Sequence, residues 1–424
     1  MARKKTVLLM TVGTGVGDEE KTESLAHGIF FSIESNNPDK IIFFGSKDSM
    51  KTIDYIKDDI IEDYGEYEFI EIEHIDDFKE YFNQIRAKVL EFVDEKVIID
   101  YTSGTKTMTM SAAFASMIYH KNLIFVSGER KEGIVKKGTE KILSQNLYPV
   151  YDELMLEKVK DLFNSNRFEA GKVLLDDIVE TEDKDLYTQL FDIYYNFDNI
   201  NYEKALERFD EDFLNKIREK WPHLSVKFTE NRNALFNMRT IDTQKVDLGK
   251  KPWKNKKYKR RCYYILASLL NNAKRRFNEG KYDDAIARLY RSFELIAQIR
   301  LREKYNINSS NVDIEILKNR DLPEDYIDSL EKIRADLNDN IKFGLVKDYD
   351  LLFHLEDDLG IFYSENEPEI YKCLEFRNKS ILAHGLKYQT DENYINFEKL
   401  VFEAANILTN DLNRFLNQTL FPEF

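Results

Sequence analysis

The sequence predicts an α/β domain with a parallel sheet in the N-terminal part, followed by an all-α remainder. Up to about residue 150, short β-branched runs alternate with segments of helix length, and strands separated by helices are typical of a parallel sheet covered on both faces. From Tyr151 onward, apolar residues recur at helical spacing and glycine becomes rare. With 424 residues, the chain is long enough for two or three domains that each bury a core.

The α/β part is expected to contain strands and helices in strict alternation. The expected strands are residues 6–12, 40–44, 68–72, 97–101 and 123–127. The expected helices are residues 21–35, 49–64, 78–93 and 106–120. After Gly128, residues 133–143 are expected to form a hairpin-like extension that closes the domain near residue 150.

A basic stretch at residues 250–261 divides the helical part. The expected domains are therefore an α/β domain at 1–150, a helical connector at 151–260 and a helical domain at 261–424. The basic stretch mixes cations with Trp253 and Tyr258, a pattern suited to single-stranded nucleic acid, although a solvated loop between domains has the same composition.

The connector contains two similar segments that begin at Phe168 and Tyr202. They lie 34 residues apart, which is the period of tetratricopeptide repeats. A third similar segment at Tyr282 breaks the period, and two copies cannot build a solenoid. A helical-repeat binding module stays open as an alternative.

The composition excludes several classes of protein. A formal charge of −15 argues against a protein that coats nucleic acid indiscriminately, so any RNA contact must be local. Two distant cysteines and scattered histidines give neither a disulfide framework nor a metal site. No apolar run is long enough to cross a membrane, and the apolar run at residues 7–10 is too short for a signal peptide. A cytoplasmic protein is expected.

Two loops at the carboxyl ends of expected strands carry small and hydroxylated residues, in the place where open parallel sheets bind ligands. The second loop leads into a helix whose N-terminal amides would face a phosphate. A dinucleotide fingerprint would need glycine where Asp18 stands, and a Walker loop would need glycine where Glu20 stands. The first loop contains Thr11, Gly13, Thr14 and Gly15, and the second contains Ser103, Gly104, Thr105, Lys106, Thr107 and Met108.

Near the C-terminal end, Arg377 and Asn378 are followed by a short apolar run and His384. Seven residues complete nearly two turns of a helix, so Arg377 and His384 are expected on one helix face with Asn378 beside them. The apolar residues 381–383 predict that this helix packs into a core. Gly385 is expected to be its C-cap, which would put His384 in the last turn, where the helix dipole favours the imidazolium form.

An arginine beside a histidine suits a phosphodiester substrate. Arginine can hold phosphate oxygens, and histidine can take or give the proton of a ribose hydroxyl without a metal. A solvated helix surface carries the same pair without any function.

These motifs resemble those of a known family. Arg377-Asn378 followed by His384 resembles the motif of HEPN ribonucleases, and residues 285–295 are similar to the first long helix of that domain. Gly104-Thr105-Lys106 with Met108 resembles the ligand loop of CARF domains, as do residues 126–130 followed by Gly133. The order of the parts resembles the CARF/HEPN ancillary ribonucleases of type III CRISPR systems, of the Csm or Csx type.

The resemblance implies a Rossmann-like CARF domain, a helical connector and an all-α HEPN domain in a homodimer. It implies that cyclic oligoadenylate, a ring of four or six adenylates, binds between two CARF domains and switches on cleavage of single-stranded RNA. The implied ligand-binding residues are Thr11, Gly13, Thr14, Gly15, Ser103, Gly104, Thr105, Lys106, Thr107, Met108, Gly128 and Arg130.

The resemblance also implies a metal-independent reaction that leaves a 2′,3′-cyclic phosphate. His384 would be the general acid or base, Arg377 would hold the phosphate, and Asn378 would orient the scissile group. No cofactor besides the activator is implied. The lack of a long apolar run predicts no membrane contact, and the net acidity with no helix-turn-helix signature predicts no stable contact with duplex DNA. Whether the CARF domain also cuts its own activator through Ser103, Thr105 or Thr11, as some relatives do, stays open. The alternative is a nucleotide-sensing regulator or scaffold without nuclease activity.

Overall fold

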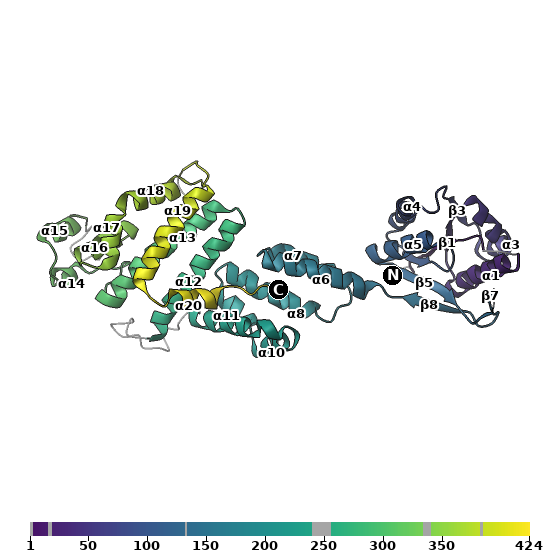
Figure 1. Ribbon diagram of the computed structural model, residues 1–424, viewed down its shortest axis with the longest axis horizontal. Coiled ribbons are helices and arrows are strands. Elements are labelled where there is room, and N and C mark those ends of the chain that lie inside the picture. Colours follow the sequence, from purple (N-terminus) through teal and green to yellow (C-terminus); the bar gives the residue numbers. More distant parts are fainter. Residues whose placement is uncertain (1–2, 16–18, 132–133, 240–255, 334–340, 382–384) are drawn as a thin grey trace. The chain divides into compact units, whose positions relative to one another are not determined.

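The protein was analysed as a computed structural model that describes residues 3–15, 19–131, 134–239, 256–333, 341–381 and 385–424. Internal contacts divide the chain into two compact units (Figure 1). Unit 1 comprises residues 1–156 and 178–181, and unit 2 comprises residues 157–177 and 182–424. Within the described ranges, no helix combines the length and apolar character needed to cross a bilayer.

Unit 1 is an α/β fold built on one six-stranded sheet with the order β3-β2-β1-β4-β5-β8 (Figure 1). Its first five strands are parallel, as predicted, and β8 runs antiparallel to β5. The strands are β1 (Thr6–Val12), β2 (Lys40–Gly45), β3 (Glu68–Glu71), β4 (Lys96–Asp100), β5 (Asn122–Ser127) and β8 (Lys141–Gln145). The helices are α1 (Glu19–Asn36), η1 (Lys47–Ser49), α2 (Met50–Asp54), α3 (Lys57–Tyr64), α4 (Phe78–Glu91) and α5 (Lys106–Ile118).

Two predicted elements of unit 1 are wrong in detail. The helix expected at 49–64 is broken, because the N–H of Ile56 turns back to the carbonyl of Ile53 at 2.9 Å and ends α2. The hairpin expected at 133–143 lies earlier and consists of β6 (Arg130–Lys131) and β7 (Ile134–Val135). Residues 141–145 instead extend the main sheet, because Ile142 packs with the core on one sheet face.

The core of unit 1 lies on both faces of the sheet, because successive residues of a strand point to opposite faces. Val7 and Leu9 of β1 pack with residues of α4 and α5. Leu8 and Met10 pack with α1 and with the α2–α3 segment. This two-sided burial explains why the parallel strands are near-continuous apolar runs.

Unit 2 is all-α, as predicted. Its first part contains α6 (Tyr148–Asn164, whose first turns belong to unit 1), α7 (Phe168–Asp176), α8 (Lys184–Asp198), α9 (Tyr202–Arg208), α10 (Glu211–Lys220), η2 (Pro222–Leu224) and α11 (Ser225–Met238). Its second part contains α12 (Lys256–Asn278), α13 (Tyr282–Tyr305), α14 (Ile314–Lys318), α15 (Glu324–Lys332), α16 (Leu345–His354), α17 (Asp358–Glu365), α18 (Glu367–Lys379), α19 (Asp391–Leu408) and α20 (Leu412–Thr419).

A buried polar cluster joins the two parts of unit 2. Asp198 at the end of α8 is 4% exposed and accepts hydrogen bonds from Arg275 Nε at 2.7 Å and Asn272 Nδ2 at 2.8 Å. Burial lowers the pKa of Arg275 to about 9. The connector and the terminal helices therefore share one core, while the domain boundary expected at residue 260 stays a prediction.

The three similar segments of the helical part each begin after the same kind of turn between two helices. Phe168, Tyr202 and Tyr282 each open a helix. The residues two positions earlier are left-handed, with φ of 59° at Asn166, 62° at Ile200 and 73° at Gly280. A shared turn followed by an aromatic residue accounts for the likeness of these segments without a common period.

The buried Asp348 of α16 gives a prediction about stability and pH. Neither of its carboxylate oxygens has a hydrogen-bond partner in the described structure, and burial raises the pKa of Asp348 from 3.8 to about 7. Because the folded pKa is the higher one, the contribution of Asp348 to the free energy of unfolding should fall as pH rises from about 4 to about 7, and then level off. The interval from 3.8 to about 7 corresponds to at most about 4 kcal/mol.

Asp348→Asn should remove this pH dependence, because the amide stays neutral. Denaturant unfolding between about pH 4 and about pH 8 would measure it. The difference in the free energy of unfolding between the wild type and the variant should change over this interval, and a slope that is the same in both proteins would contradict the assignment.

Candidate ligand cleft and candidate nuclease site

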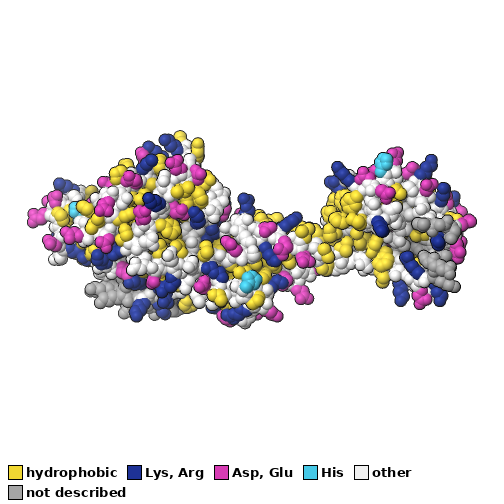
Figure 2. Space-filling view, viewed as in Figure 1, with side chains coloured by type: hydrophobic (Ala, Val, Ile, Leu, Met, Phe, Trp, Pro, Cys, Tyr) yellow, Lys and Arg dark blue, Asp and Glu magenta, His cyan; other side chains and the backbone are white. Residues whose placement is uncertain are grey.

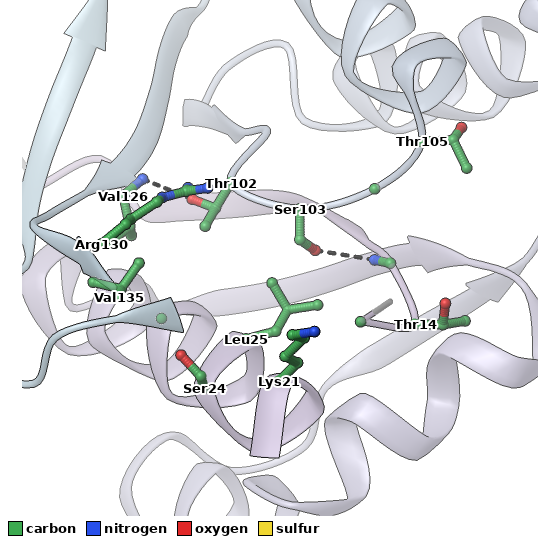
Figure 3. A pocket seen from close by; sticks show the side chains of 14 residues that line it. Thr14, Lys21, Ser24, Leu25, Thr102, Ser103, Thr105, Val126, Arg130 and Val135 are labelled. Carbon is green, nitrogen blue, oxygen red and sulfur yellow. Dashed lines mark hydrogen bonds between the residues drawn. The ribbon is translucent and has the colours of Figure 1, made fainter. Parts of the chain in front are cut away.

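A cleft of about 580 Å³ lies in unit 1 at the carboxyl ends of the parallel strands. Its walls come from the loops after β1 and β4, from α1 and from the β5–β7 region. Figure 3 shows Lys21, Ser24 and Leu25 projecting from α1 toward the Ser103 loop. The lining residues are Gly13, Thr14, Gly15, Lys21, Ser24, Leu25, Gly28, Thr102, Ser103, Gly104, Thr105, Val126, Arg130 and Val135.

Hydrogen bonds hold the two loops together. The Ser103 hydroxyl donates to the Thr11 carbonyl at 3.0 Å and accepts from the Gly13 N–H at 3.0 Å (Figure 3). The Thr11 hydroxyl donates to the Ser103 carbonyl. Thr11 and Ser103 are both buried, so their hydroxyls shape the cleft by fixing its floor.

The loops approach so closely that they need glycine. A Cβ on Gly13 would lie 3.0 Å from the backbone nitrogen of Gly104. Gly104 has φ of 122°, a conformation that other residues rarely adopt. The two glycines therefore let backbone meet backbone at the mouth of the cleft.

The turn after β4 is fixed by a buried carboxylate. Asp100 is 1% exposed and accepts from the Thr102 N–H at 2.6 Å and from the Ser32 hydroxyl. Burial raises the pKa of Asp100 despite these hydrogen bonds. The Thr102 hydroxyl in turn accepts from the Val126 N–H at 2.8 Å, which joins this turn to β5.

The cleft receives cations from two separate elements. Lys21 comes from the first turn of α1, and the exposed Arg130 comes from β6 and extends beside Thr102 (Figure 3). Arg130 was among the ligand-binding residues predicted from the sequence, whereas Lys21 was not. The detectable signal was the spacing of Lys21, Ser24 and Gly28, which share one helix face.

The predicted ligand residues divide into three groups. Gly13, Thr14, Gly15, Ser103, Gly104, Thr105 and Arg130 line the cleft. Thr11 and Met108 lie behind it, where the Met108 sulfur accepts from the Thr105 N–H at 3.0 Å. Lys106, Thr107 and Gly128 are not among the lining residues.

The predicted nuclease residues lie around the end of α18. The Arg377 guanidinium stacks 4.6 Å above the ring of Tyr290 on α13 and donates to the Asn378 side chain at 3.1 Å. His384 lies outside the described residues, as do Leu382 and Ala383.

The expectation of one helix through Arg377 and His384 is wrong. Helix α18 ends at Lys379, and Ser380 is extended with ψ of 147°. The chain turns back on itself, because the Lys379 carbonyl accepts from the Lys387 N–H at 3.1 Å and is no longer available to continue a helix. Ile381, the one residue of the apolar run that the structure describes, is 60% exposed, which is the opposite of the burial expected for it.

Gly385 has a different role from the predicted C-cap. A Cβ on Gly385 would lie 2.0 Å from the Lys379 carbonyl oxygen. The Gly385 N–H donates to the Ser380 carbonyl at 3.1 Å. Glycine is therefore needed because two backbones approach each other after the helix has ended.

The described part of the basic stretch forms the start of α12. Lys256, Lys259 and Arg260 line a second cleft of about 640 Å³ together with Arg414. Lys259 forms an ion pair with Glu303, and Arg414 pairs with Asp411. Residues 250–255 lie outside the described ranges. Among the described residues, no three His, Cys, Asp or Glu side chains are placed to hold a metal ion.

The chain therefore combines an α/β unit that carries a phosphate-suited cleft with an all-α unit that carries the arginine–histidine motif. Three family models match consecutive parts of the chain: the Csa3 CRISPR-associated Rossmann-like domain at residues 23–137, the Csm6 6H domain at 151–238 and the Csm6 HEPN domain at 254–408. The resemblance to CARF/HEPN ancillary proteins of type III CRISPR systems is thereby confirmed.

The solved structure of a Csm6 protein agrees with this fold. Csm6 of Enterococcus italicus, bound to cyclic hexa-2′-fluoro-hexa-dAMP, matches with a TM-score of 0.62 and 14% identity, over 98% of this chain and 99% of that one. Can2 of Sulfobacillus thermosulfidooxidans, in complex with cyclic tetra-adenylate, matches with a TM-score of 0.24 and 14% identity, over 51% of this chain and 69% of that one. No protein with a curated function matches the sequence.

Proposed function

We propose that the protein is a single-stranded RNA endoribonuclease that cyclic oligoadenylate switches on by binding in the unit 1 cleft. The observation that carries the proposal is the order of parts in one chain: a Rossmann-like unit with a phosphate-suited cleft precedes a match to a Csm6 HEPN domain. The net charge of −15 fits a protein that engages RNA only locally.

The cleft suits a ring of phosphates and ribose groups. Lys21 and Arg130 supply positive charge, and Thr14 and Thr105 supply hydroxyls at its rim. The N-terminus of α5 follows the Gly104 loop directly, so its dipole favours an anion nearby. The E. italicus Csm6 structure holds a cyclic hexanucleotide, which supports a cyclic oligoadenylate as the activator here, and the proposal covers rings of four and of six units.

The proposed reaction is attack of a ribose 2′-hydroxyl on the adjacent phosphorus, which expels the 5′-oxygen of the next nucleotide and leaves a 2′,3′-cyclic phosphate. His384 acts as general base or acid in this proton transfer. Arg377 holds the phosphate and offsets its developing charge, while Asn378 orients the scissile group. No step requires a metal ion.

A homodimer is part of the proposal, and an apolar stripe on α5 supports it. Met110, Phe114 and Ile118 are 53%, 42% and 45% exposed and follow one another at helical spacing. Phe78 extends the stripe, with its ring centroid 5.5 Å from that of Phe114. Figure 2 shows hydrophobic side chains gathered over this part of unit 1. Because α5 begins beside the ligand loop, pairing along it would bring two clefts together.

Phe114→Glu should weaken this dimer at least about 100-fold, because a carboxylate would be buried against apolar side chains. Sedimentation at graded protein concentrations would measure the dimer, and activator-dependent RNA cleavage should fall with it. Ile61→Glu on α3 is the matched control, since Ile61 is 54% exposed on another helix of unit 1. A Phe114 variant that stays dimeric would refute the use of α5 as the interface.

An RNA cleavage assay with and without cyclic tri-, tetra- and hexa-adenylate tests the function as a whole. Cleavage that appears only with one of these rings, and that persists in a metal chelator, is the expected result. Ligand binding without cleavage would instead support the alternative of a nucleotide-sensing regulator or scaffold.

A further inference from the structure

The short strands β6 and β7 form the part of the cleft wall that the main sheet does not hold. Strands β5 and β8 are paired as far as Ser127 and Lys141, and β6 and β7 pair beyond that point. Arg130 of β6 and Val135 of β7 both line the cleft (Figure 3). Because two paired strands alone are only marginally stable, contacts with another element are needed to set where Arg130 stands.

One carboxylate joins the base of this strand pair to α1. Glu140, the residue before β8, accepts a hydrogen bond through Oε2 from the Gly138 N–H at 2.6 Å. Its Oε1 lies 3.1 Å from Nε2 of His27 on α1, and Nε2 is the donor because an ionised carboxylate only accepts. The Glu140 side chain is 4% exposed, so water competes little for these hydrogen bonds.

Three further hydrogen bonds extend from this turn to the start of β6. The Thr139 hydroxyl accepts from the Glu129 N–H at 3.0 Å and donates to the Lys136 carbonyl at 2.7 Å. The Lys136 N–H donates to the Glu129 carbonyl at 2.8 Å. The backbone that leads into β6 is therefore tied to the turn that the carboxylate holds on α1.

Apolar packing does not replace this contact. A Cβ on Gly128 would lie 2.7 Å from the Val135 side chain, so glycine lets Val135 pack closely within the strand pair. Strand β7 also lies close to α1, but apolar contact has no preferred direction. The hydrogen bond between His27 and Glu140 is directional and crosses from one element to the other.

We propose that His27 and Glu140 are positioning residues of the ligand cleft: together they fix β6 relative to α1 and thereby set where the Arg130 guanidinium meets the activator. The inference rests on the proposed function. His27 is not among the residues that line the cleft, so it acts on the ligand through the strand pair. A hydrogen bond from a guanidinium to a phosphate depends on distance and direction, and a displaced Arg130 would lose it.

The experiment measures binding of cyclic tetra- and hexa-adenylate to full-length His27→Ala and His27→Gln by calorimetry. We expect His27→Ala to weaken binding by about 3- to 10-fold, because at most the contribution of one charged hydrogen bond is lost. His27→Gln should recover part of the loss, because its amide N–H still donates to Glu140. His74→Ala is the matched control, since His74 is an exposed histidine of unit 1 outside the cleft lining.

The same variants in an Arg130→Ala background separate positioning from direct contact with the ligand. If His27 acts by placing Arg130, His27→Ala should weaken binding by less than about twofold once Arg130 is absent. An equal loss in both backgrounds would overturn the proposal. Unchanged affinity in His27→Ala, or an equal loss in His74→Ala, would overturn it as well.

Amide hydrogen exchange without ligand distinguishes a failure of this proposal from a failure of the proposed function. Exchange at Gly138 should accelerate in His27→Ala, because its acceptor Glu140 is no longer held, and should not change in His74→Ala. A wild type that binds neither ring, together with this faster exchange, would refute the proposed activator while leaving the contact between α1 and the strand pair intact. Unchanged exchange in His27→Ala would refute that contact.

Discussion

Replacing His384 with alanine should lower kcat for activator-dependent RNA cleavage by about 10²- to 10⁴-fold, because a positioned proton-transfer group contributes a factor of this size. Binding of cyclic oligoadenylate should not change, since the proposed ligand cleft lies in unit 1 and His384 belongs to unit 2. Initial rates with a labelled single-stranded RNA, and activator binding by calorimetry, would measure the two properties separately.

Arg377 and Asn378 are the other two proposed nuclease residues, and a variant of Arg377 tests a role different from that of His384. Arg377→Ala should lower kcat and raise the KM for RNA, because the guanidinium is proposed to hold the phosphate in both the ground and the transition state. His223→Ala is the control, since His223 is an exposed histidine of η2 in the same unit. Cleavage retained by His384→Ala, or lost equally in His223→Ala, would remove His384 from the mechanism.

Local patterns were sufficient to predict the five parallel strands of unit 1 because these strands are defined by local composition. The apolar run of β1 and the runs of β2, β4 and β5 are buried on both faces, and such runs are visible without any knowledge of their neighbours. The glycine and hydroxyl residues of the Gly13 and Gly104 loops were visible for the same reason. Their mutual contact follows from strand order, which puts β1 beside β4.

The end of α18 could not be predicted in this way. The sequence from Arg377 to Gly385 is locally consistent with a helix, yet the helix ends at Lys379. The Ser380 hydroxyl bonds Asp283, which is 97 residues away in the sequence. A tertiary contact over this distance overrides local propensity, and no pattern within the motif reveals it.

Lys21 was missed for a related reason. A lysine near the start of an amphipathic helix is ordinarily a solvated residue. Its position at the cleft depends on how α1 packs against the sheet, where Leu8, Met10 and Ile29 share one core. Once this packing is known, Lys21 and Arg130 are the cations that line the cleft.

Removing both of these cations gives the second large expected effect. Lys21→Ala combined with Arg130→Ala should raise the activator concentration needed for half-maximal RNA cleavage at least about 100-fold. The reason is that a hydrogen bond to a charged group contributes about 1.5 kcal/mol or more, which is about a tenfold change in affinity for each cation. The maximal rate at saturating activator should return to the wild-type value, because neither residue belongs to the nuclease site.

The salt dependence of binding distinguishes lost charge from a damaged fold. Wild-type affinity for the activator should weaken as salt is added, and the double variant should show a shallower dependence, because fewer ionic contacts remain to be screened. Lys51→Ala is the matched control, since Lys51 is a lysine of α2 in the same unit with a 76% exposed side chain. A double variant with wild-type affinity and an unchanged salt slope would place the activator elsewhere, whereas a reduced maximal rate at saturation would show that unit 1 also limits the chemistry in unit 2.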